Sequence, residues 1–321
     1  MKQIALDRFG TDEIISLYKD KPIIKVLQGI RRSGKSFMLE LLSRKILESG
    51  AAENQILLLN MEDFENAEFL DSKKLYDFIK SKSEAAGGKK LYLFLDEIQE
   101  VSGWEKLVNS LYSSATIDAD IYITGSNANL LSSELATYLS GRYVLIHVWP
   151  LSYREFLHFN SESDSAAAFR KFIKFGGFPG LKDMMENPVQ IRSYLEGIYS
   201  TVLLKDVIAR NRIRDTAVLE KIILYIADNT GNIFSAKRIS DFMKSGGRPL
   251  SVETIYNDIK YLENALVLYK VPRYDVRGKK ILETMEKYYL ADQGLLTFLH
   301  GYKDTYINGI LENIVFIELL R

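Results

Sequence analysis

The sequence has 321 residues, of which 47% are hydrophobic and 26% are charged, with 6 Pro and 20 Gly. This composition is average for a globular protein, so it excludes disordered, collagen-like and repeat classes, and the length predicts two or three domains. The chain has no Cys, which excludes disulfides, thiolate nucleophiles and cysteine-ligated metal sites. Its 3 His residues lie far apart in the sequence, and we assign no role to His147, His158 or His300.

Charge is balanced overall but not along the chain. The 42 Lys and Arg equal the 42 Asp and Glu, so any attraction to nucleic acid must be local. Residues 205–280 contain 15 basic and 9 acidic side chains, a net charge of +6. The amino terminus lacks the apolar core of a signal peptide, and no stretch approaches the about 18 apolar residues of a membrane span. We therefore expect a cytoplasmic protein with no membrane partner.

The first half of the chain alternates apolar runs with helical patterns. Residues 23–28 read as a buried strand, which is followed by a glycine loop and an amphipathic helix that ends near Gly50. Further strands are expected at residues 56–60, 91–95, 121–124 and 143–148. This order predicts an α/β fold with a parallel sheet covered by helices on both faces, and with ligands bound beyond the carboxyl ends of its strands.

A phosphate-binding motif occupies the first strand-to-helix junction. Residues 29–36 read GIRRSGKS, a full match to G-x-x-x-x-G-K-[ST]. Glycines let successive N–H groups converge on phosphate oxygens, the lysine reaches the β- and γ-phosphates, and the serine hydroxyl binds Mg²⁺. The predicted cofactor-binding residues are Gly29, Arg32, Ser33, Gly34, Lys35, Ser36 and Phe37. For Arg31 and Arg32 the alternative is that they are solvated loop side chains.

Two carboxylates follow the strand expected at residues 91–95. Asp96 suits a role in holding Mg²⁺ together with Ser36, and Glu97 suits a general base that activates a water for attack on the γ-phosphate. The alternative is that this pair only marks the acidic start of a helical turn.

Polar residues at two other strand ends complete the predicted catalytic set. Ser126 and Asn127 follow the strand expected at residues 121–124 and could bind the attacking water or the γ-phosphate; the alternative is a simple turn. Arg142 precedes the last strand and suits an arginine finger that stabilises the transferring phosphoryl group in a neighbouring subunit of a homo-oligomer. The alternative is a surface ion pair. With Lys35 and Glu97, these residues form the predicted catalytic set.

Several segments together resemble a family of predicted bacterial and archaeal AAA-type ATPases. These segments are GIRRSGKS, LYLFLDE, ITGSN, LSGR, PLSYREF and FGGFPG, and the resemblance covers essentially the whole chain. It implies a P-loop ATPase core at residues 1–155, a helical lid at 156–208, a winged helix-turn-helix at 209–295 and the start of a truncated nuclease-like domain at 296–321.

The resemblance also bears on the nucleotide. Pro179, within Gly177-Phe178-Pro179, resembles a segment that packs near adenine in signal-transducing relatives, and the alternative is a helix-breaking turn. The chain has no N-K-x-D tetrapeptide, which reads guanine in GTPases, so ATP is the expected nucleotide.

The second half contains three amphipathic helical patterns and a pair of strands. The helices are expected from residue 215, from Ser235 and over residues 251–264, and the strands pair through residues 266–271 and a return at 277–280. Three helices and a hairpin form a winged helix, whose third helix enters a DNA major groove in DNA-binding examples. Asp258 and Glu263 dilute the positive charge of that helix, so docking to a protein stays open.

The sequence ends inside an apolar helical pattern over residues 307–321. In the resembled family this helix opens the nuclease-like domain, and Glu312 would be at most its first acidic residue. We expect no nuclease activity from these residues.

These patterns predict an Mg²⁺-dependent ATPase whose nucleotide state moves a winged helix that contacts double-stranded DNA or a DNA-bound protein. The alternative is a signalling nucleotide switch with little turnover and a protein-docking winged helix. A small-molecule kinase is disfavoured, because no acceptor-site motif is evident.

Overall fold

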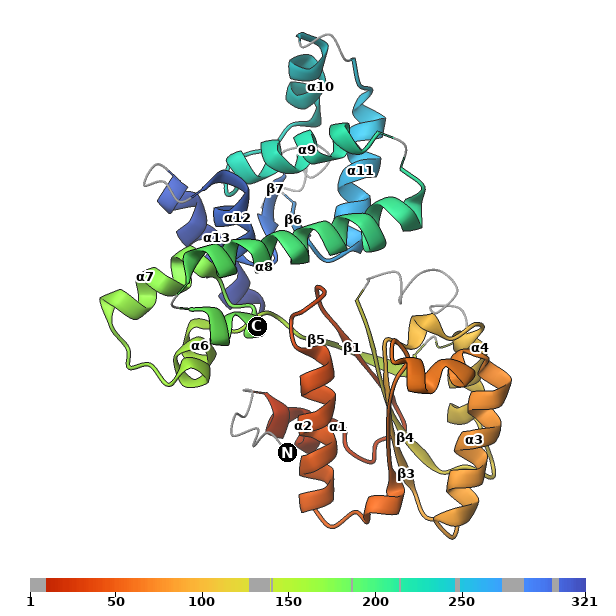
Figure 1. Ribbon diagram of the computed structural model, residues 1–321. Coiled ribbons are helices and arrows are strands. Elements are labelled where there is room, and N and C mark those ends of the chain that lie inside the picture. The colour runs from red at the N-terminus through yellow and green to blue at the C-terminus, as the bar shows by residue number, and fades with distance from the viewer. Residues whose placement is uncertain are drawn as a thin grey trace, which may run out of the picture. The chain divides into compact units, whose positions relative to one another are not determined.

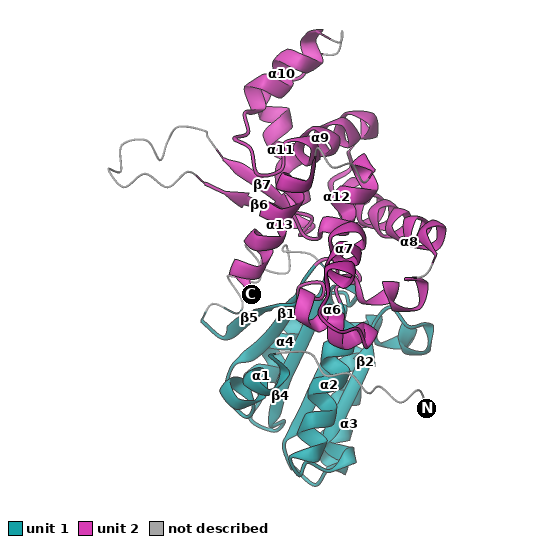
Figure 2. Ribbon diagram, turned by 90° about the vertical axis from the view of Figure 1, so that its left-hand side faces the viewer, with its two compact units in different colours: residues 1–29, 34–148 teal, residues 30–33, 149–321 magenta. Residues whose placement is uncertain are grey.

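The computed structural model describes residues 10–126, 139, 141–185, 187–213, 215–245, 249–272, 286–301 and 306–321. The chain divides into two compact units (Figure 2). The first contains the described residues within 1–29 and 34–148, and the second contains 30–33 and those within 149–321. The middle of the glycine loop therefore groups with the second unit.

The first unit is built on a five-stranded parallel sheet. Its strands are β1 (Ile24–Gln28), β2 (Ile56–Asn60), β3 (Leu91–Asp96), β4 (Ala119–Gly125) and β5 (Tyr143–His147), in the order β2-β3-β4-β1-β5. All neighbouring pairs are parallel, so their carboxyl ends share one edge. The register places Gln28 beside Gly125 and His147, which fixes where the glycine loop leaves the sheet. The five strands expected from the sequence are confirmed.

Helices cover both faces of this sheet (Figure 1). Helices α1 (Thr11–Tyr18) and α2 (Lys35–Glu48) pack on one face, where Leu27, Phe94 and Tyr122 point. Helices α3 (Ser72–Ala85) and α4 (Trp104–Tyr112) pack on the other, against Val26 and the residues that alternate with the first set. Alternate strand residues thus face two apolar cores, which is why the strands are apolar along most of their length. Short helical turns η1 (Glu53–Gln55), η2 (Phe64–Leu70) and η3 (Ile98–Glu100) complete the connections.

The second unit is mostly helical. It begins with α6 (Tyr153–Asn160), α7 (Ala166–Phe175), η5 (Pro179–Met184) and α8 (Pro188–Thr201), and α8 continues directly into a π-helical segment, η6 (Val202–Ala209). Helices α9 (Thr216–Asp228), α10 (Ala236–Ser245) and α11 (Val252–Asn264) follow, then strands β6 (Leu268–Val271) and β7 (Lys287–Leu290), and finally α12 (Gln293–His300) and α13 (Ile307–Leu320).

Strands β6 and β7 form an antiparallel pair in which Leu268 lies beside Leu290. Three helices followed by an antiparallel pair agree with the element order expected for this half, but the expected return at residues 277–280 lies outside the described residues. None of the helices in the described part of the chain is long and apolar enough to cross a membrane.

The paired glycines of the FGGFPG segment have a packing role inside the second unit. Gly176 has a φ of +84°, and the N–H of Gly177 donates to the Asp292 carboxylate at 2.7 Å. A Cβ atom on Gly177 would lie 2.2 Å from the carbonyl oxygen of Leu151, which no side chain tolerates. Gly177 therefore lets its backbone lie close to that of Leu151, and Gly176 leaves room for Asp292 and the N–H of Gly294 at the start of α12.

Candidate active site

The glycine loop between β1 and α2 has the backbone conformation of an anion-binding nest. Arg32 has a φ of +69° and Gly34 a φ of +99°, with Ser33 between them outside the left-handed region. The N–H of Ser33 donates to the carbonyl of Ile30 at 3.1 Å, which closes the turn. Alternating backbone handedness turns successive N–H groups toward one point, and α2 begins at Lys35 with its positive dipole end. The loop is therefore suited to a phosphate group.

Lys35 is buried at this edge, with 4% of its surface exposed. Its ammonium donates to the carbonyl of Gly29 at 3.1 Å and lies 3.6 Å from the Glu97 carboxylate. The side chain thus folds back over the loop and meets an acidic residue from another strand end. A buried cation at the loop is the arrangement expected for binding a polyphosphate.

Asp96 is the last residue of β3, and its carboxylate accepts hydrogen bonds from the Thr124 and Ser36 hydroxyls. Burial raises the pKa of Asp96, and these two hydrogen bonds oppose the rise. The structure therefore brings together Ser36 and Asp96, the two residues predicted to share a metal ion.

Glu97 follows β3 in a left-handed conformation with a φ of +50°. Its N–H donates to the Thr124 hydroxyl at 2.9 Å, and its carboxylate accepts from the Gln99 amide at 2.5 Å. It precedes the turn η3, but its side chain makes no capping hydrogen bond there. Glu97 therefore does precede a helical turn, as the alternative expected, and its carboxylate also lies 3.6 Å from the Lys35 ammonium, so its position agrees with both interpretations.

Two residues of this edge escaped the sequence analysis. Thr124 joins both acidic residues, since its hydroxyl donates to Asp96 and accepts from the Glu97 N–H. Gln99 holds the Glu97 carboxylate. Thr124 ends a predicted strand, but its choice depends on the pairing of β3 with β4, which the sequence does not give, and nothing local marked Gln99.

The other predicted site residues do not all lie at this edge of the sheet. Ser126 is fully buried at the same edge, and its hydroxyl bonds to no group among the described residues. Asn127 lies outside the described residues. Arg32 is exposed, and Phe37 is half-buried in the first turn of α2. Pro179 opens η5 in the second unit.

Arg142 lies at the opposite edge of the sheet from the glycine loop. It directly precedes β5, whose first residue pairs with Ile24 at the start of the parallel strand β1. Its guanidinium donates to Asn109 at 2.7 Å and lies 5.5 Å from the centre of the Tyr112 ring. The fold does not bring Arg142 together with Lys35 within one chain.

The residues at the carboxyl edge fit a magnesium ion. Mg²⁺ prefers oxygen ligands and is usually held by one or two carboxylates together with waters and substrate phosphates. Ser36 and Asp96 supply a hydroxyl and a carboxylate that already contact one another. No cluster of three or more acidic, His or Cys side chains suited to a metal occurs among residues that the structure describes.

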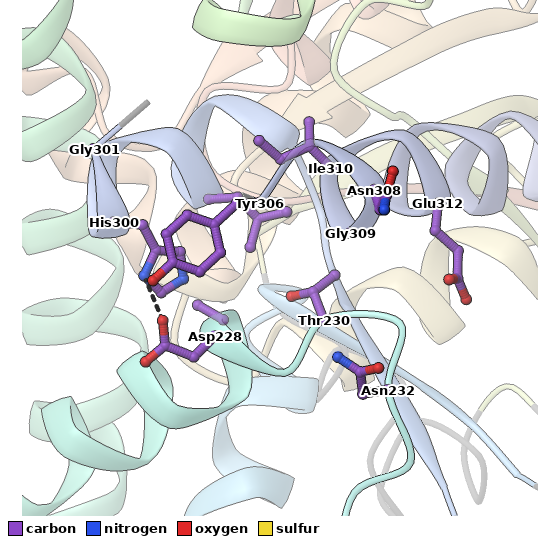
Figure 3. A pocket seen from close by; sticks show the side chains of 12 residues that line it. Asp228, Thr230, Asn232, His300, Gly301, Tyr306, Asn308, Gly309, Ile310 and Glu312 are labelled. Carbon is purple, nitrogen blue, oxygen red and sulfur yellow. Dashed lines mark ion pairs between the residues drawn. The ribbon is translucent and has the colours of Figure 1, made fainter. Parts of the chain in front are cut away.

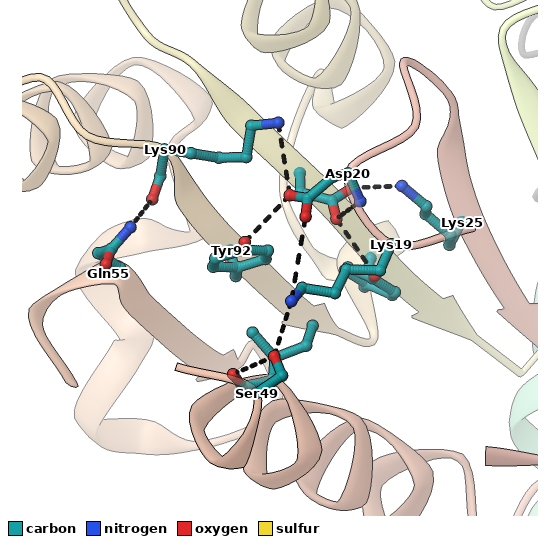
Figure 4. Close-up of polar contacts among 10 residues, drawn as sticks. Lys19, Asp20, Lys25, Ser49, Gln55, Lys90 and Tyr92 are labelled. Carbon is teal, nitrogen blue, oxygen red and sulfur yellow. Dashed lines mark hydrogen bonds and ion pairs between the residues drawn. The ribbon is translucent and has the colours of Figure 1, made fainter. Parts of the chain in front are cut away.

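A second polar cluster lies at the amino edge of the same sheet (Figure 4). Lys25 is fully buried and hydrogen-bonded to the Asp120 carboxylate, which also accepts from the Asp20 N–H at 2.9 Å and the Tyr122 hydroxyl at 3.2 Å. The Tyr92 hydroxyl donates to Asp20 at 3.0 Å. Burial lowers the pKa of Lys25, and Asp120 opposes that fall. Lys25 and the two tyrosines of this cluster are thus each hydrogen-bonded to one of its two aspartates.

The second unit contains a cavity of about 290 Å³ between α9, α12 and α13 (Figure 3). His300 Nδ1 lies 3.0 Å from the Asp228 carboxylate there, and the His300 ring stacks on Tyr306 with centroids 4.8 Å apart. Glu312 is held by the Tyr289 hydroxyl at 2.7 Å. No Lys or Arg is among the described residues that line the cavity.

Comparison with known proteins agrees with the geometry of the first unit. A family profile described as an AAA domain matches residues 21–157, and one described as a domain of unknown function (DUF8612) matches residues 166–306. An uncharacterized protein of Haemophilus influenzae is 43% identical to the chain, over 100% of this chain and 80% of that protein. The chain belongs to an AAA-type P-loop family.

Other similar proteins add little about chemistry. An uncharacterized protein of Methanocaldococcus jannaschii is 30% identical to this AAA-type chain, over 93% of the chain and 66% of that protein. A solved structure of the replication initiator DnaA, bound to AMPPCP and single-stranded DNA, has a TM-score of 0.40 and 16% identity, and the match covers 79% of this chain and 86% of that one.

Proposed function

We propose that this AAA-type protein binds ATP with Mg²⁺ and hydrolyses it. The observation that carries the proposal is the meeting of three strand ends at one edge. There the nest-forming loop presents Lys35, and Glu97 lies 3.6 Å from its ammonium beside the Asp96–Ser36 pair. Phosphoanhydride hydrolysis needs a polyphosphate cradle, oxygen ligands for a metal and a base close to the γ-phosphate, and this edge supplies all three.

Each residue has a separate role in this proposal. The loop N–H groups and Lys35 bind the phosphates, and Ser36 and Asp96 hold the ion. When bound, Mg²⁺ supplies charge that is shared with the β- and γ-phosphate oxygens. Glu97 accepts the proton of a water that attacks the γ-phosphorus as the bond to the β-phosphate oxygen breaks. Thr124 orients the two acidic residues differently, because its hydroxyl donates to the Asp96 carboxylate and accepts from the backbone N–H of Glu97.

The nucleotide also draws Lys35 away from Glu97 in this proposal. In the structure the Glu97 carboxylate is engaged by Lys35 and Gln99. Phosphate oxygens compete for the ammonium, so binding of ATP leaves the carboxylate with a weaker cationic partner and a better ability to take a proton. The same engagement is the observation that favours the alternative, a nucleotide switch with slow turnover.

In this proposal Arg142 acts on the nucleotide of a neighbouring subunit and not on that of its own chain. Its place at the amino edge separates it from the loop of its own chain by the length of a five-residue strand, about 16 Å. An exposed arginine at that edge would serve as an arginine finger for a neighbouring copy in a homo-oligomer.

For the second unit we propose a winged helix formed by α9, α10, α11 and the β6–β7 pair. Thr254, Asn257 and Lys260 are exposed on α11, whereas Asp258 is buried, with 7% of its surface exposed. Of the two acidic residues that weakened the case for DNA from the sequence, Asp258 therefore does not lie on the outer face, whereas Glu263 is half-buried and its carboxylate lies 3.8 Å from the Lys260 ammonium. With the net charge of +6 over residues 205–280, this supports contact with double-stranded DNA over docking to a protein.

ATP turnover by wild type and two variants tests the first proposal. We expect Lys35→Ala to weaken ATP binding, and Glu97→Gln to lower kcat about 10²–10⁴-fold while ATP still binds. Lys45→Ala, later on α2, and Glu100→Gln, at an exposed carboxylate three residues after Glu97, serve as matched controls that should keep wild-type rates. Equal turnover in wild type and Glu97→Gln would contradict hydrolysis at this edge.

The DNA proposal is tested by the same assay with duplex DNA at two salt concentrations. We expect duplex DNA to bind and to change the ATP turnover rate, and both effects to weaken steeply at the higher salt, because phosphate contacts release counterions. Lys260→Ala should reduce the salt dependence, whereas Lys73→Ala on the first unit should not. Absence of binding at low salt would leave protein docking as the role of the winged helix.

A further inference from the structure

The glycine loop carries an ion pair that the proposed chemistry does not use. Arg31, the third residue of the loop, forms a two-pronged contact with Asp206: its Nε donates at 3.1 Å and its Nη2 at 3.4 Å to the two carboxylate oxygens. Both residues belong to the second unit, and they are 175 residues apart in sequence. The fork of a guanidinium on a carboxylate fixes direction as well as distance.

This pair is protected from water. The Asp206 side chain is 3% exposed and that of Arg31 is 12% exposed. Val202, Leu203 and Val207, neighbours of Asp206 in η6, are also buried. The Asp206 carboxylate would lose a compensating charge if this contact broke, so the contact restrains both side chains.

The element that carries Asp206 is unusual. Residues 202–209 of η6 form a π-helical segment that continues α8. Such segments are rare, and they frequently occur at functional sites. Here the displaced turn presents Asp206 to the glycine loop.

The loop residue next to the pair adopts a conformation that needs support. Arg32 is left-handed with a φ of +69°, which costs free energy for a residue with a Cβ atom. Its neighbours Ile30 and Ser33 are buried. Burial raises the pKa of Tyr194 on α8, and the positive charge of Arg32 opposes that rise. The contact that joins this loop to the helical part of the second unit is the Arg31–Asp206 pair.

We propose that Asp206 is a positioning residue for the phosphate loop: by holding Arg31 it keeps residues 30–33 in the nest conformation, and it couples phosphate binding to η6. Arg31 is then an anchor and not a phosphate ligand. This inference rests on ATP binding at the loop. Because coupling between two sites is reciprocal, a change at Asp206 alters nucleotide affinity, and the nucleotide alters the stability of η6.

ATP affinity of the full chain is the first measurement. We expect Asp206→Asn and Arg31→Ala each to weaken ATP binding about tenfold or more, and the double variant to be no weaker than the worse single one, because both remove the same contact. Lys205→Ala, an exposed neighbour on η6, should bind like wild type. Arg31→Lys keeps the positive charge but not the two-pronged contact, so its ATP affinity should lie between those of wild type and Arg31→Ala.

Hydrogen exchange separates positioning from a purely structural role. In wild type we expect ATP to slow amide exchange in residues 202–209, and we expect Asp206→Asn to abolish that protection even where the folded variant still binds ATP at raised concentration. If Asp206→Asn does not fold, Arg31→Lys serves for both measurements.

Three outcomes would overturn the inference while leaving ATP binding intact. They are wild-type affinity in the folded variants, additive losses in the double variant, or tighter ATP binding by Asp206→Asn, which would make Arg31 a phosphate ligand that Asp206 restrains. Failure of wild type itself to bind ATP would instead refute the proposed function.

Discussion

The two edges of the parallel sheet each bury a lysine among carboxylates, yet they are built differently. At the amino edge Lys25 is bonded directly to Asp120, and the tyrosines around them bond to the same acidic groups. At the carboxyl edge Lys35 lies 3.6 Å from Glu97, beyond hydrogen-bond distance, and Glu97 is held in a left-handed conformation. Charged groups that are hydrogen-bonded directly to one another stabilise the fold. An ion pair beyond hydrogen-bond distance, next to a loop suited to phosphate, can rearrange when a ligand binds.

The largest contrast should come from removing each lysine in turn. Lys25→Met leaves Asp120 buried without its cation, so we expect a loss of about 3–5 kcal/mol in the free energy of unfolding. Lys35→Met should change that free energy by less than about 1 kcal/mol but weaken ATP binding severely. Denaturant unfolding and ATP titration of both variants measure the two effects. The comparison fails if the two variants lose stability equally.

A smaller effect should follow from Thr124→Val, which keeps the shape of the side chain. The change removes the donor to Asp96 and the acceptor of the Glu97 N–H, so we expect kcat to fall about 10–100-fold with a smaller change in KM. Thr124→Ser keeps the hydroxyl and should recover most of the rate. Steady-state kinetics of both variants checks this, and a Thr124→Val enzyme with wild-type kcat would show that the hydroxyl serves folding only.

The smallest effect at neutral pH is expected at the amino edge for Tyr122→Phe. Loss of one hydrogen bond to Asp120 should cost about 1 kcal/mol. Burial raises the pKa of Tyr122, with the charge of Asp120 adding to the rise. The folded state therefore favours the neutral phenol, and its contribution is complete below the ordinary tyrosine pKa near 10 and is lost as the pH rises above it.

We accordingly expect wild type to lose stability more steeply above pH ~10 than Tyr122→Phe does. The groups around this phenol are Asp120, Asp20, Lys25 and Tyr92, and Tyr92 should retain part of the alkaline loss because burial raises its pKa too. Thermal unfolding from pH 7 to 11 measures the difference. Parallel curves for the two proteins would refute it.

The sheet and the placement of polar residues at its carboxyl edge were predictable from the sequence because their signals are local. Buried parallel strands are apolar along their length, and a strand followed by GIRRSGKS or by Asp96-Glu97 fixes which edge the polar groups occupy. The amino-edge position of Arg142 was not predicted, although its place before a strand of a parallel sheet was the available signal. These features depend on neighbours in the chain.

Contacts between distant segments were not predictable in the same way. Arg31 gives no sign in the sequence that its partner is Asp206, and the π-helical turn of η6 has no distinct composition. Thr124 could have been chosen over Ser126 only with the register of β3 and β4 known, since that register decides which hydroxyl faces the carboxylates. These residues are brought together by the tertiary structure, and their residue types alone do not identify their partners.

The close contacts of Gly176 and Gly177 with Asp292 affect how relatives of this chain can be recognised. A stretch of backbone that admits no side chain restricts the amino acids allowed there as strongly as a catalytic requirement would. Searches that weight these glycines would therefore retrieve proteins sharing the architecture of the second unit, including ones whose nucleotide chemistry has been lost.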